Sequence, residues 1–236
     1  MNLAVELRAF SYTYPDGTAS LRTIDVVIKH GEKVVLVGPN GAGKSTMLLA
    51  LAGFIRGQGS VVIDGMELCS KNLRKIRSVL GCCLENPDDQ LFMPTLYEDV
   101  IFGPLNLNLP IQQAKSNTDL AFEQVGLATL TDKAPHHLSA GQKRAASIAT
   151  VLAMSPKIIT FDEPDGSLDP RNRRKLENTL RSLSQTLIIA TCNMRFAAAV
   201  AERAIVVNSG RIVADGSCDT ILFNKDLMYD NGLEMP

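Results

Sequence analysis

The residues with the clearest chemistry lie in one glycine-rich stretch near the N-terminus. In order, they are Gly38, Pro39, Asn40, Gly41, Ala42, Gly43, Lys44, Ser45 and Thr46. They fit the pattern G-x-x-x-x-G-K-[ST], in which glycines let backbone N–H groups curve around phosphate oxygens. A helix beginning at Lys44 would direct its positive end at the same anion. Lys44 is expected to reach the β- and γ-phosphates of a nucleoside triphosphate, and the Ser45 hydroxyl to ligate Mg²⁺.

A second candidate site lies where the apolar run 158–161 ends in Asp162 and Glu163. Asp162, at the end of a predicted strand, is placed to hold Mg²⁺ through water, and Glu163 to polarise an attacking water molecule. An isolated run of this kind is more often a strand that enters a loop, but the phosphate loop beside it favours nucleotide hydrolysis. The chain has no N-K-x-D motif, which disfavours a GTPase.

Short apolar runs and amphipathic stretches supply the elements that must position these residues. The predicted strands cover residues 3–10, 24–28, 33–37, 60–63, 79–84, 157–161, 186–190, 204–207 and 211–214. The predicted helices lie near 44–54, 111–125, 139–154, 170–183 and 194–201. Strands that alternate with helices indicate an α/β fold with a parallel sheet. Residues 86–155 contain no convincing strand and are interpreted as a helical insert between two α/β halves.

A third motif precedes the carboxylates. Ser139 is expected to cap an amphipathic helix that runs to about Met154. Residues 138–142, Leu-Ser-Ala-Gly-Gln, resemble the L-S-G-G-Q signature of ATP-binding-cassette (ABC) proteins, with Ala140 in place of the first glycine. The resemblance implies that Ser139, Ala140, Gly141 and Gln142 face the γ-phosphate of an ATP bound by the opposite subunit.

The resemblance to ABC proteins extends from about residue 3 to 222. It implies a phosphate-loop, RecA-like core with an N-terminal antiparallel β subdomain, in which the helical subdomain of about residues 86–155 is inserted. Residues 223–236 are left as a short C-terminal tail. Tyr14 matches the aromatic residue that stacks on adenine, with Tyr12 the weaker candidate, and Ser167, Leu168 and Asp169 match the D-loop that crosses the dimer interface.

Two stretches narrow the resemblance and also contain its main departures. Residues 85–92 and 98–106 are similar to the ATPases of energy-coupling-factor importers, particularly the cobalt and nickel branch. The family has Gln where this chain has Glu85, near Mg²⁺ and the attacking water, and it has His at the γ-phosphate where this chain has Cys192. Glu85 and Cys192 are therefore candidate catalytic residues. Either they impair hydrolysis, or they are tolerated variants with compensation elsewhere.

Composition sets limits on the partners. The 236 residues carry 24 basic and 25 acidic side chains, so no broad basic surface indicates a nucleic-acid partner. Hydrophobic residues make up 45%, enough for a folded core. No run approaches the roughly 20 apolar residues of a membrane helix, and the N-terminus lacks signal-peptide features. We expect a peripheral protein at the cytoplasmic face of the membrane.

Three function classes remain. The favoured one is a transport ATPase that uses ATP and Mg²⁺, works with a second ABC ATPase subunit, identical or homologous, and drives integral membrane subunits for coupling and substrate binding. The second is a nucleotide-binding, degenerate subunit of an unequal pair. The third is a soluble cassette protein acting on DNA or ribosomes, which the short spacing between Lys44 and Ser139 disfavours because it leaves no room for a long coiled-coil arm.

Overall fold

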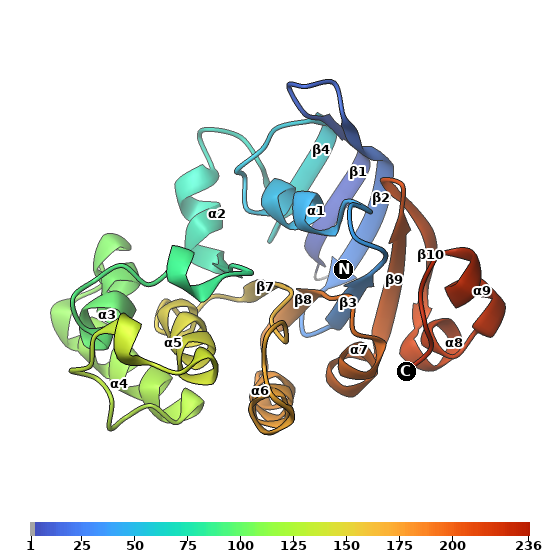
Figure 1. Ribbon diagram of the computed structural model, residues 1–236. Helices are drawn as coiled ribbons and strands as arrows, with labels where there is room; N and C mark the ends of the chain where they lie inside the picture. The colour runs from blue at the N-terminus through green and yellow to red at the C-terminus, as the bar shows by residue number, and fades with distance from the viewer. Residues whose placement is uncertain (1–2) are drawn as a thin grey trace.

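Two β-sheets with a helix between them carry the phosphate loop (Figure 1). The computed structural model describes residues 3–236. The four-stranded antiparallel sheet has the order β2-β1-β4-β5, with β1 at Leu3–Thr13, β2 at Ala19–Lys29, β4 at Gln58–Ile63 and β5 at Met66–Glu67. The six-stranded sheet has the order β10-β9-β3-β8-β7-β6. Its strands are β3 Lys33–Val37, β6 Leu80–Cys83, β7 Ile158–Asp162, β8 Thr186–Ala190, β9 Arg203–Asn208 and β10 Arg211–Ser217.

The larger sheet is parallel except at one edge, because β10 returns antiparallel to β9. Its central strands are near-continuous apolar runs with buried side chains, as expected for a parallel sheet covered on both faces. Helix α1, Lys44–Leu51, packs between the two sheets and contributes Met47 and Leu51 to their shared core. The α/β class, the phosphate-loop core and the N-terminal antiparallel subdomain are confirmed.

The stretch expected to be helical lies to one side of the larger sheet (Figure 1). It contains α3 at Leu96–Asn106, α4 at Ile111–Val125 and α5 at Ala140–Leu152, with short 3₁₀ turns at Pro87–Asp89 and Pro135–His137. Thr95 and Glu98 form a capping box that begins α3, and Gly126 ends α4 in the left-handed conformation. No strand occurs between residues 87 and 154, all of which the structure describes.

Several elements differ from the sequence-based expectation. Strand β2 begins at Ala19 instead of residue 24, and helix α2, Leu73–Val79, stands where the pattern predicted no element before β6. Helix α2 is only 7 residues long, shorter than the window of about 11–18 residues in which helical periodicity is read. Helix α3 was not predicted because it contains Gly103 and Pro104, residues that usually interrupt a helix.

The C-terminal half completes the cover of the larger sheet. Its helices are α6 Pro170–Ser182, α7 Met194–Val200, α8 Cys218–Leu222 and α9 Lys225–Asp230. Within the C-terminal tail, Met228 is fully buried and Leu233 is 7% exposed, and both belong to the main apolar cluster. Among residues 3–236, no helix is long and apolar enough to cross a bilayer.

Candidate active site

The phosphate loop leaves strand β3 and turns directly into α1, as its pattern predicted. Gly43 caps this helix in the left-handed conformation (φ 109°), and a Cβ there would lie 2.8 Å from the Ser20 carbonyl oxygen. The position therefore demands glycine. Lys44 is buried, and its Nζ donates to the carbonyl oxygens of Gly38 at 2.8 Å and Pro39 at 3.3 Å. The ammonium group thus lies inside the curve of the loop.

Ser45 and Asp162, predicted to share a metal ion, are in direct contact. The Ser45 hydroxyl donates to Asp162 Oδ1 at 3.0 Å, joining the start of α1 to the end of β7. Burial raises the pKa of the Asp162 carboxyl, the hydrogen bond from Ser45 opposes this, and the nearby charges of Glu85 and Glu163 raise the pKa further. A hydroxyl and a carboxylate form the oxygen donor set that Mg²⁺ prefers. The residues present therefore fit this ion.

Glu163, Cys192 and Lys44 meet at the same edge of the sheet. Glu163 Oε2 accepts from the backbone N–H of Cys192 at 3.0 Å, and Glu163 Oε1 lies 3.0 Å from the Cys192 sulfur. Lys44 Nζ lies 3.2 Å from that sulfur and 3.7 Å from Glu163 Oε1. Burial raises the pKa of the Cys192 thiol, which favours its protonated form. Lys44 begins α1, Glu163 and Cys192 lie in the loops after β7 and β8, and the three form one polar cluster.

Glu85 and Tyr14 lie on the walls of the same pocket, which has a volume of about 560 Å³. Glu85 follows strand β6 and is exposed. The Tyr14 hydroxyl lies 3.0 Å from Thr46 Oγ1, and its ring contacts Tyr12 edge-on at 4.9 Å. Tyr14 is therefore held next to the phosphate loop, whereas Tyr12 does not line this pocket.

The signature residues do not line the phosphate-loop pocket: Ala140 lines a neighbouring pocket, and Gly141 and Gln142 line another. Ser139 caps α5 and forms the capping box with Gln142, so the predicted helix start is confirmed. Ala140 lines a pocket of about 410 Å³ with Ser167, Leu168, Glu85 and Glu163. The D-loop ends at Asp169, whose carboxylate caps α6 through the backbone N–H groups of residues 171 and 172. Within one chain, the signature does not line the pocket that contains the phosphate loop.

Comparison with known proteins identifies the family. A model described as ABC transporter matches residues 21–166. The chain belongs to the ABC transporter family. ATPases of this family bind ATP, normally with Mg²⁺, and this chain is an ATP-hydrolysing subunit of a transporter.

Curated relatives match this ABC ATPase over almost its whole length. A putative ABC transporter ATP-binding protein of Geobacter sulfurreducens is 45% identical over 98% of this chain and 94% of the relative. An energy-coupling factor transporter ATP-binding protein, EcfA, of Carboxydothermus hydrogenoformans is 42% identical over 100% of this chain and 88% of the relative. These similarities support an ATPase of the energy-coupling-factor type.

Solved structures of ABC ATPases also superpose on this chain. The structure of cbiO1 from Clostridium perfringens, described as part of the ABC transporter complex cbiONQ, superposes with a TM-score of 0.87 at 32% identity, covering 98% of this chain and 94% of that chain. A dimeric ATP-binding cassette bound to ADP and phosphate superposes with a TM-score of 0.81 at 26% identity, covering 91% and 98%. The cassette fold of this ABC ATPase is therefore shown by two solved relatives.

Two buried charges beside the site of this ABC ATPase were not anticipated from its sequence. Asp165, 4% exposed, accepts from Thr191 Oγ1 at 2.9 Å and from Asn193 Nδ2 at 2.8 Å, so it ties the β7–α6 loop to the loop that carries Cys192. Arg144, on the signature helix, is also 4% exposed and donates to the carbonyl oxygens of Leu84, at 2.7 Å, and Glu85. Neither residue belongs to a predicted motif, because each acquires its role through contacts distant in sequence.

Proposed function

We propose that this chain is the ATPase subunit of an energy-coupling-factor importer, attached to the cytoplasmic face of the membrane. The names of the curated relatives and the cbiONQ neighbour support the importer class. The resemblance of residues 85–106 to the cobalt and nickel branch makes these ions, or another micronutrient, the proposed cargo. Copurification of the complex followed by elemental analysis of its bound ion tests the cargo. A bound organic molecule without cobalt or nickel would contradict the metal cargo and favour another micronutrient.

The pocket beside the phosphate loop supplies the binding groups for Mg·ATP. Lys44 is placed to meet the β- and γ-phosphates, Tyr14 to contact the adenine, and Glu163 to accept a proton from the attacking water. Ser45 and Asp162 would hold Mg²⁺, which neutralises charge on the phosphate oxygens. We infer that the signature residues and Ser167–Asp169 serve the site of a second ATPase subunit, because none of them lines the pocket of their own chain that holds the phosphate loop.

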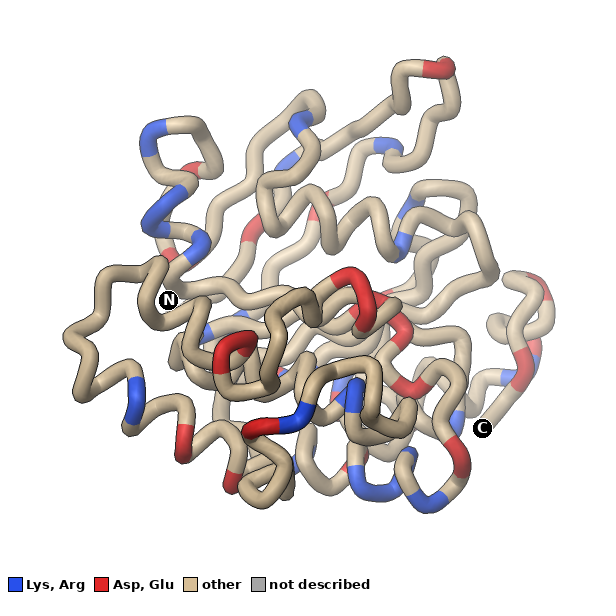
Figure 2. Tube along the Cα trace, turned by 60° about the vertical axis from the view of Figure 1, so that its left-hand side comes forward, with Lys and Arg blue, Asp and Glu red and all other residues tan. Residues whose placement is uncertain are grey.

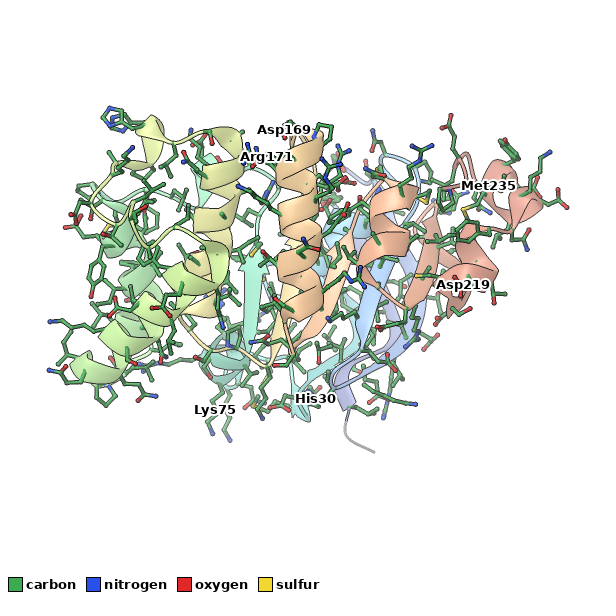
Figure 3. The ribbon with its side chains drawn as sticks, turned by 90° about the horizontal axis from the view of Figure 1, so that it is seen from below. His30, Lys75, Asp169, Arg171, Asp219 and Met235 are labelled. Atoms are coloured by element: carbon green, nitrogen blue, oxygen red, sulfur yellow. The ribbon has the colours of Figure 1, made fainter. Side chains whose placement is uncertain are left out.

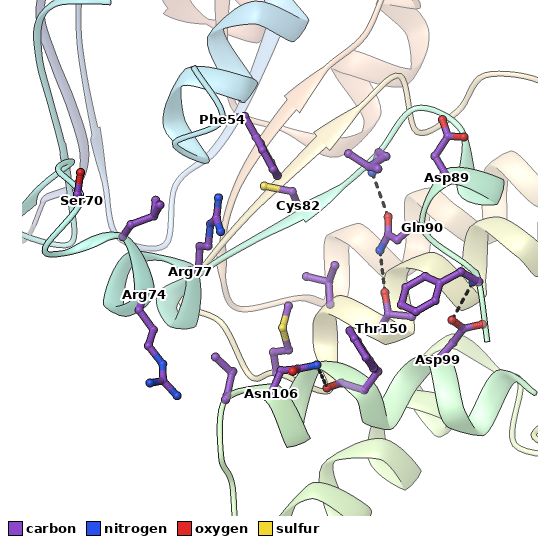
Figure 4. Close-up of a pocket in the computed structure, with 18 residues that line it drawn as sticks. Phe54, Ser70, Arg74, Arg77, Cys82, Asp89, Gln90, Asp99, Asn106 and Thr150 are labelled. Carbon is purple, nitrogen blue, oxygen red and sulfur yellow. Dashed lines mark hydrogen bonds between the residues drawn. The ribbon is translucent and has the colours of Figure 1, made fainter. Parts of the chain in front are cut away.

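A groove of about 760 Å³ on another part of the surface is the proposed docking site for the membrane subunit (Figure 4). It lies between α2, α3 and α5, and its lining includes Phe54, Phe92 and Phe102, which are 59%, 63% and 42% exposed. Exposed aromatic side chains around a concave apolar surface are typical of a protein interface. Residues between 89 and 107 form one wall of the groove, and the same region carries the resemblance to importer ATPases.

Gln90 links this groove to the nucleotide site. It lines the groove, its Oε1 accepts from the backbone N–H of Leu84 at 3.1 Å, and its Nε2 donates to Thr150 Oγ1 at 2.7 Å (Figure 4). Leu84 directly precedes Glu85. Movement of a docked partner is therefore transmitted to the loop that carries Glu85 through one side chain.

The same geometry supports a weakened hydrolytic site in this subunit. A neutral thiol at Cys192 is a poor hydrogen-bond donor, so it offers little stabilisation to a transferring phosphoryl group. Glu85 adds a carboxylate to a pocket that already contains Glu163 and lies close enough to Asp162 for their charges to interact, and its charge repels the γ-phosphate. ATP binding is retained because Lys44, Ser45 and Asp162 are in place. These two observations favour a second candidate function, in which this chain is the less active half of an unequal pair.

Restoring the family residues tests this proposal in the assembled complex. We expect Glu85→Gln and Cys192→His together to raise the kcat of ATP hydrolysis at this site by about 10²-fold or more, since one preorganised donor contributes about 10²–10³ in rate. Glu67→Gln and Cys69→His make the same changes at exposed positions and serve as the control. An unchanged kcat in the double variant, with the unaltered complex already at about 10 per second, would contradict the weakened site.

A further inference from the structure

Helix α2 and the loop before it carry a concentration of positive charge that the proposed ATP chemistry does not use. Lys71, Arg74, Lys75 and Arg77 are all exposed, and no acidic residue occurs between Glu67 and Glu85. Arg56, also exposed, joins them by donating to Ser70 Oγ at 2.7 Å. A tube coloured by charge shows basic residues gathered on one segment (Figure 2). We call these five cations the α2 cationic surface.

These cations are not neutralised within the chain. Among residues 3–236, ion pairs engage Lys143, Lys157 and Arg203 but none of the five cations of the α2 cationic surface. The whole chain has a formal net charge of −1, so the cluster reflects segregation of charge, not an excess of it. Like charges held together without counter-ions repel one another and attract an external anionic surface.

The position of the α2 cationic surface excludes the second ATPase as its partner. Lys75 lies at the edge of the molecule opposite Asp169 and Arg171, the edge where the D-loop would meet a second subunit (Figure 3). On its other side, the surface borders the docking groove, which Arg74 and Arg77 help to line. The Arg77 guanidinium lies 5.4 Å from the centre of the exposed Phe54 ring, near it in the close-up (Figure 4).

We propose that the α2 cationic surface binds anionic phospholipid headgroups beside the docked membrane subunit. The inference rests on the proposed function, because that function turns the groove toward the membrane. A protein segment that fills the groove would reach Arg74 and Arg77 but leave Lys71 and Lys75 uncovered, since these two do not line it. A bilayer presents a continuous anionic plane that reaches all of them. Clustered Lys and Arg with an adjacent aromatic residue are typical of membrane-surface contacts.

The purified full-length chain can be tested by co-sedimentation with vesicles. The unaltered protein should bind vesicles of equimolar phosphatidylcholine and phosphatidylglycerol and bind phosphatidylcholine alone far more weakly. Arg74→Gln with Lys75→Gln should weaken binding to the anionic vesicles about 25-fold, since each cation near such a surface contributes about fivefold. The binding should also fall as salt is raised, because exposed charges are screened.

The control removes one arginine and one lysine at exposed positions elsewhere, Arg211→Gln with Lys225→Gln, and should change binding less than about twofold, since these cations lie outside the proposed contact surface. Equal losses in the two double variants, or no preference for anionic vesicles, would overturn the proposal. The proposal would also be overturned if the Arg74 and Lys75 double variant kept vesicle binding but no longer copurified with the membrane subunits. The cations would then serve a protein contact. Failure of the proposed function appears separately, as absence of copurification by the unaltered chain.

Discussion

At the scale of single residues, the protonation state of the Cys192 thiol depends on its neighbours. Its sulfur lies between the Lys44 ammonium and the Glu163 carboxylate, at 3.2 and 3.0 Å. These charges have opposite effects on the pKa of the thiol, and burial, the largest influence, raises it. A thiol that stays protonated at neutral pH is neither a nucleophile nor a strong donor. The proposed weakening of hydrolysis therefore follows from its surroundings as well as from its residue type.

Gly141 of the signature allows a residue-scale test of the link to the D-loop. A Cβ at this position would lie 2.5 Å from Asn172 Cγ, and Asn172 donates to Asp169 Oδ2 at 2.6 Å. Alanine favours a helix by about 1 kcal/mol over glycine, so only this contact makes Gly141→Ala unfavourable. Overpacking typically costs about 1–3 kcal/mol, so after the helix gain we expect a net loss of up to about 2 kcal/mol in the free energy of unfolding, measured in urea.

Asn172→Ala, added to Gly141→Ala, removes the side-chain atoms that the new Cβ would contact. The double variant should be more stable than the sum of the two single losses indicates, because the two positions share one contact. Strictly additive losses would show that a side chain at position 141 does not contact Asn172. The signature and the D-loop would then be energetically independent.

At the scale of elements, the C-terminal tail is part of the main core. Met228, in α9, is fully buried, whereas Met235 near the end of the chain is 40% exposed. We expect Met228→Ala to lower the free energy of unfolding by about 2–4 kcal/mol, since it removes packed atoms and leaves a cavity. Met235→Ala is the matched control and should cost less than about 0.5 kcal/mol. Similar small losses in both variants, by denaturant titration, would mean that α9 is not packed on the domain in solution.

Asp64 joins the antiparallel sheet to the approach of β7. Its carboxylate accepts from Lys157 Nζ at 2.8 Å and lies 2.9 Å from His30 Nε2. The hydrogen bond from Lys157, aided by the charges of Lys157 and His30, holds the pKa of Asp64 below its usual value despite burial. Asp64 has a positive φ of 49°, which asparagine also tolerates, so Asp64→Asn removes the charge without backbone strain.

The pH dependence of this effect has a defined sign. A carboxyl whose folded-state pKa is lowered stabilises the protein fully above its unfolded-state pKa of about 3.9. This stabilisation is lost as pH falls through the lower folded-state pKa. We expect Asp64→Asn to lower the free energy of unfolding by up to about 1 kcal/mol at neutral pH, measured in urea. The difference between the variant and the unaltered protein should disappear below about pH 4. A gap that widens on acidification would contradict the assignment.

At the scale of the whole molecule, we propose that the signature of a second subunit completes the site at the phosphate loop, because no signature residue lines that pocket in its own chain. Glu163→Gln keeps the size of the side chain while removing the proposed proton acceptor, so a closed dimer with Mg·ATP should persist instead of reopening after hydrolysis. Light scattering, with the chain alone and with an equimolar sister subunit, measures the expected doubling of mass. Adding Lys44→Ala should abolish it, because ATP binding is lost. A monomer under both conditions in the Glu163→Gln variant would refute the two-subunit site.

The sequence by itself determined the features that depend on residues close together in the chain. The phosphate loop, the helix start at Lys44 and the capped start of α5 at Ser139 are each specified by a few consecutive residues. The buried strands β3, β7 and β8 were also predictable, because a parallel sheet covered on both faces requires continuous apolar runs. Helices α2 and α3 were not, because α2 is only 7 residues long and α3 contains Gly103 and Pro104.

The residue patterns alone did not place Lys44, Glu163 and Cys192 in one cluster; the family resemblance implied it, and the tertiary structure shows how it arises. Lys44 follows β3, Cys192 follows β8 and Glu163 follows β7, and these strands are neighbours in the order β3-β8-β7. The register pairs Ala190 with both Leu36 and Asp162, so the three strands end at the same level. Strand order and register depend on pairing between segments far apart in the chain, and local residue patterns do not encode such pairing. The chemistry at each strand end was therefore readable from the sequence, but its convergence was set by the sheet.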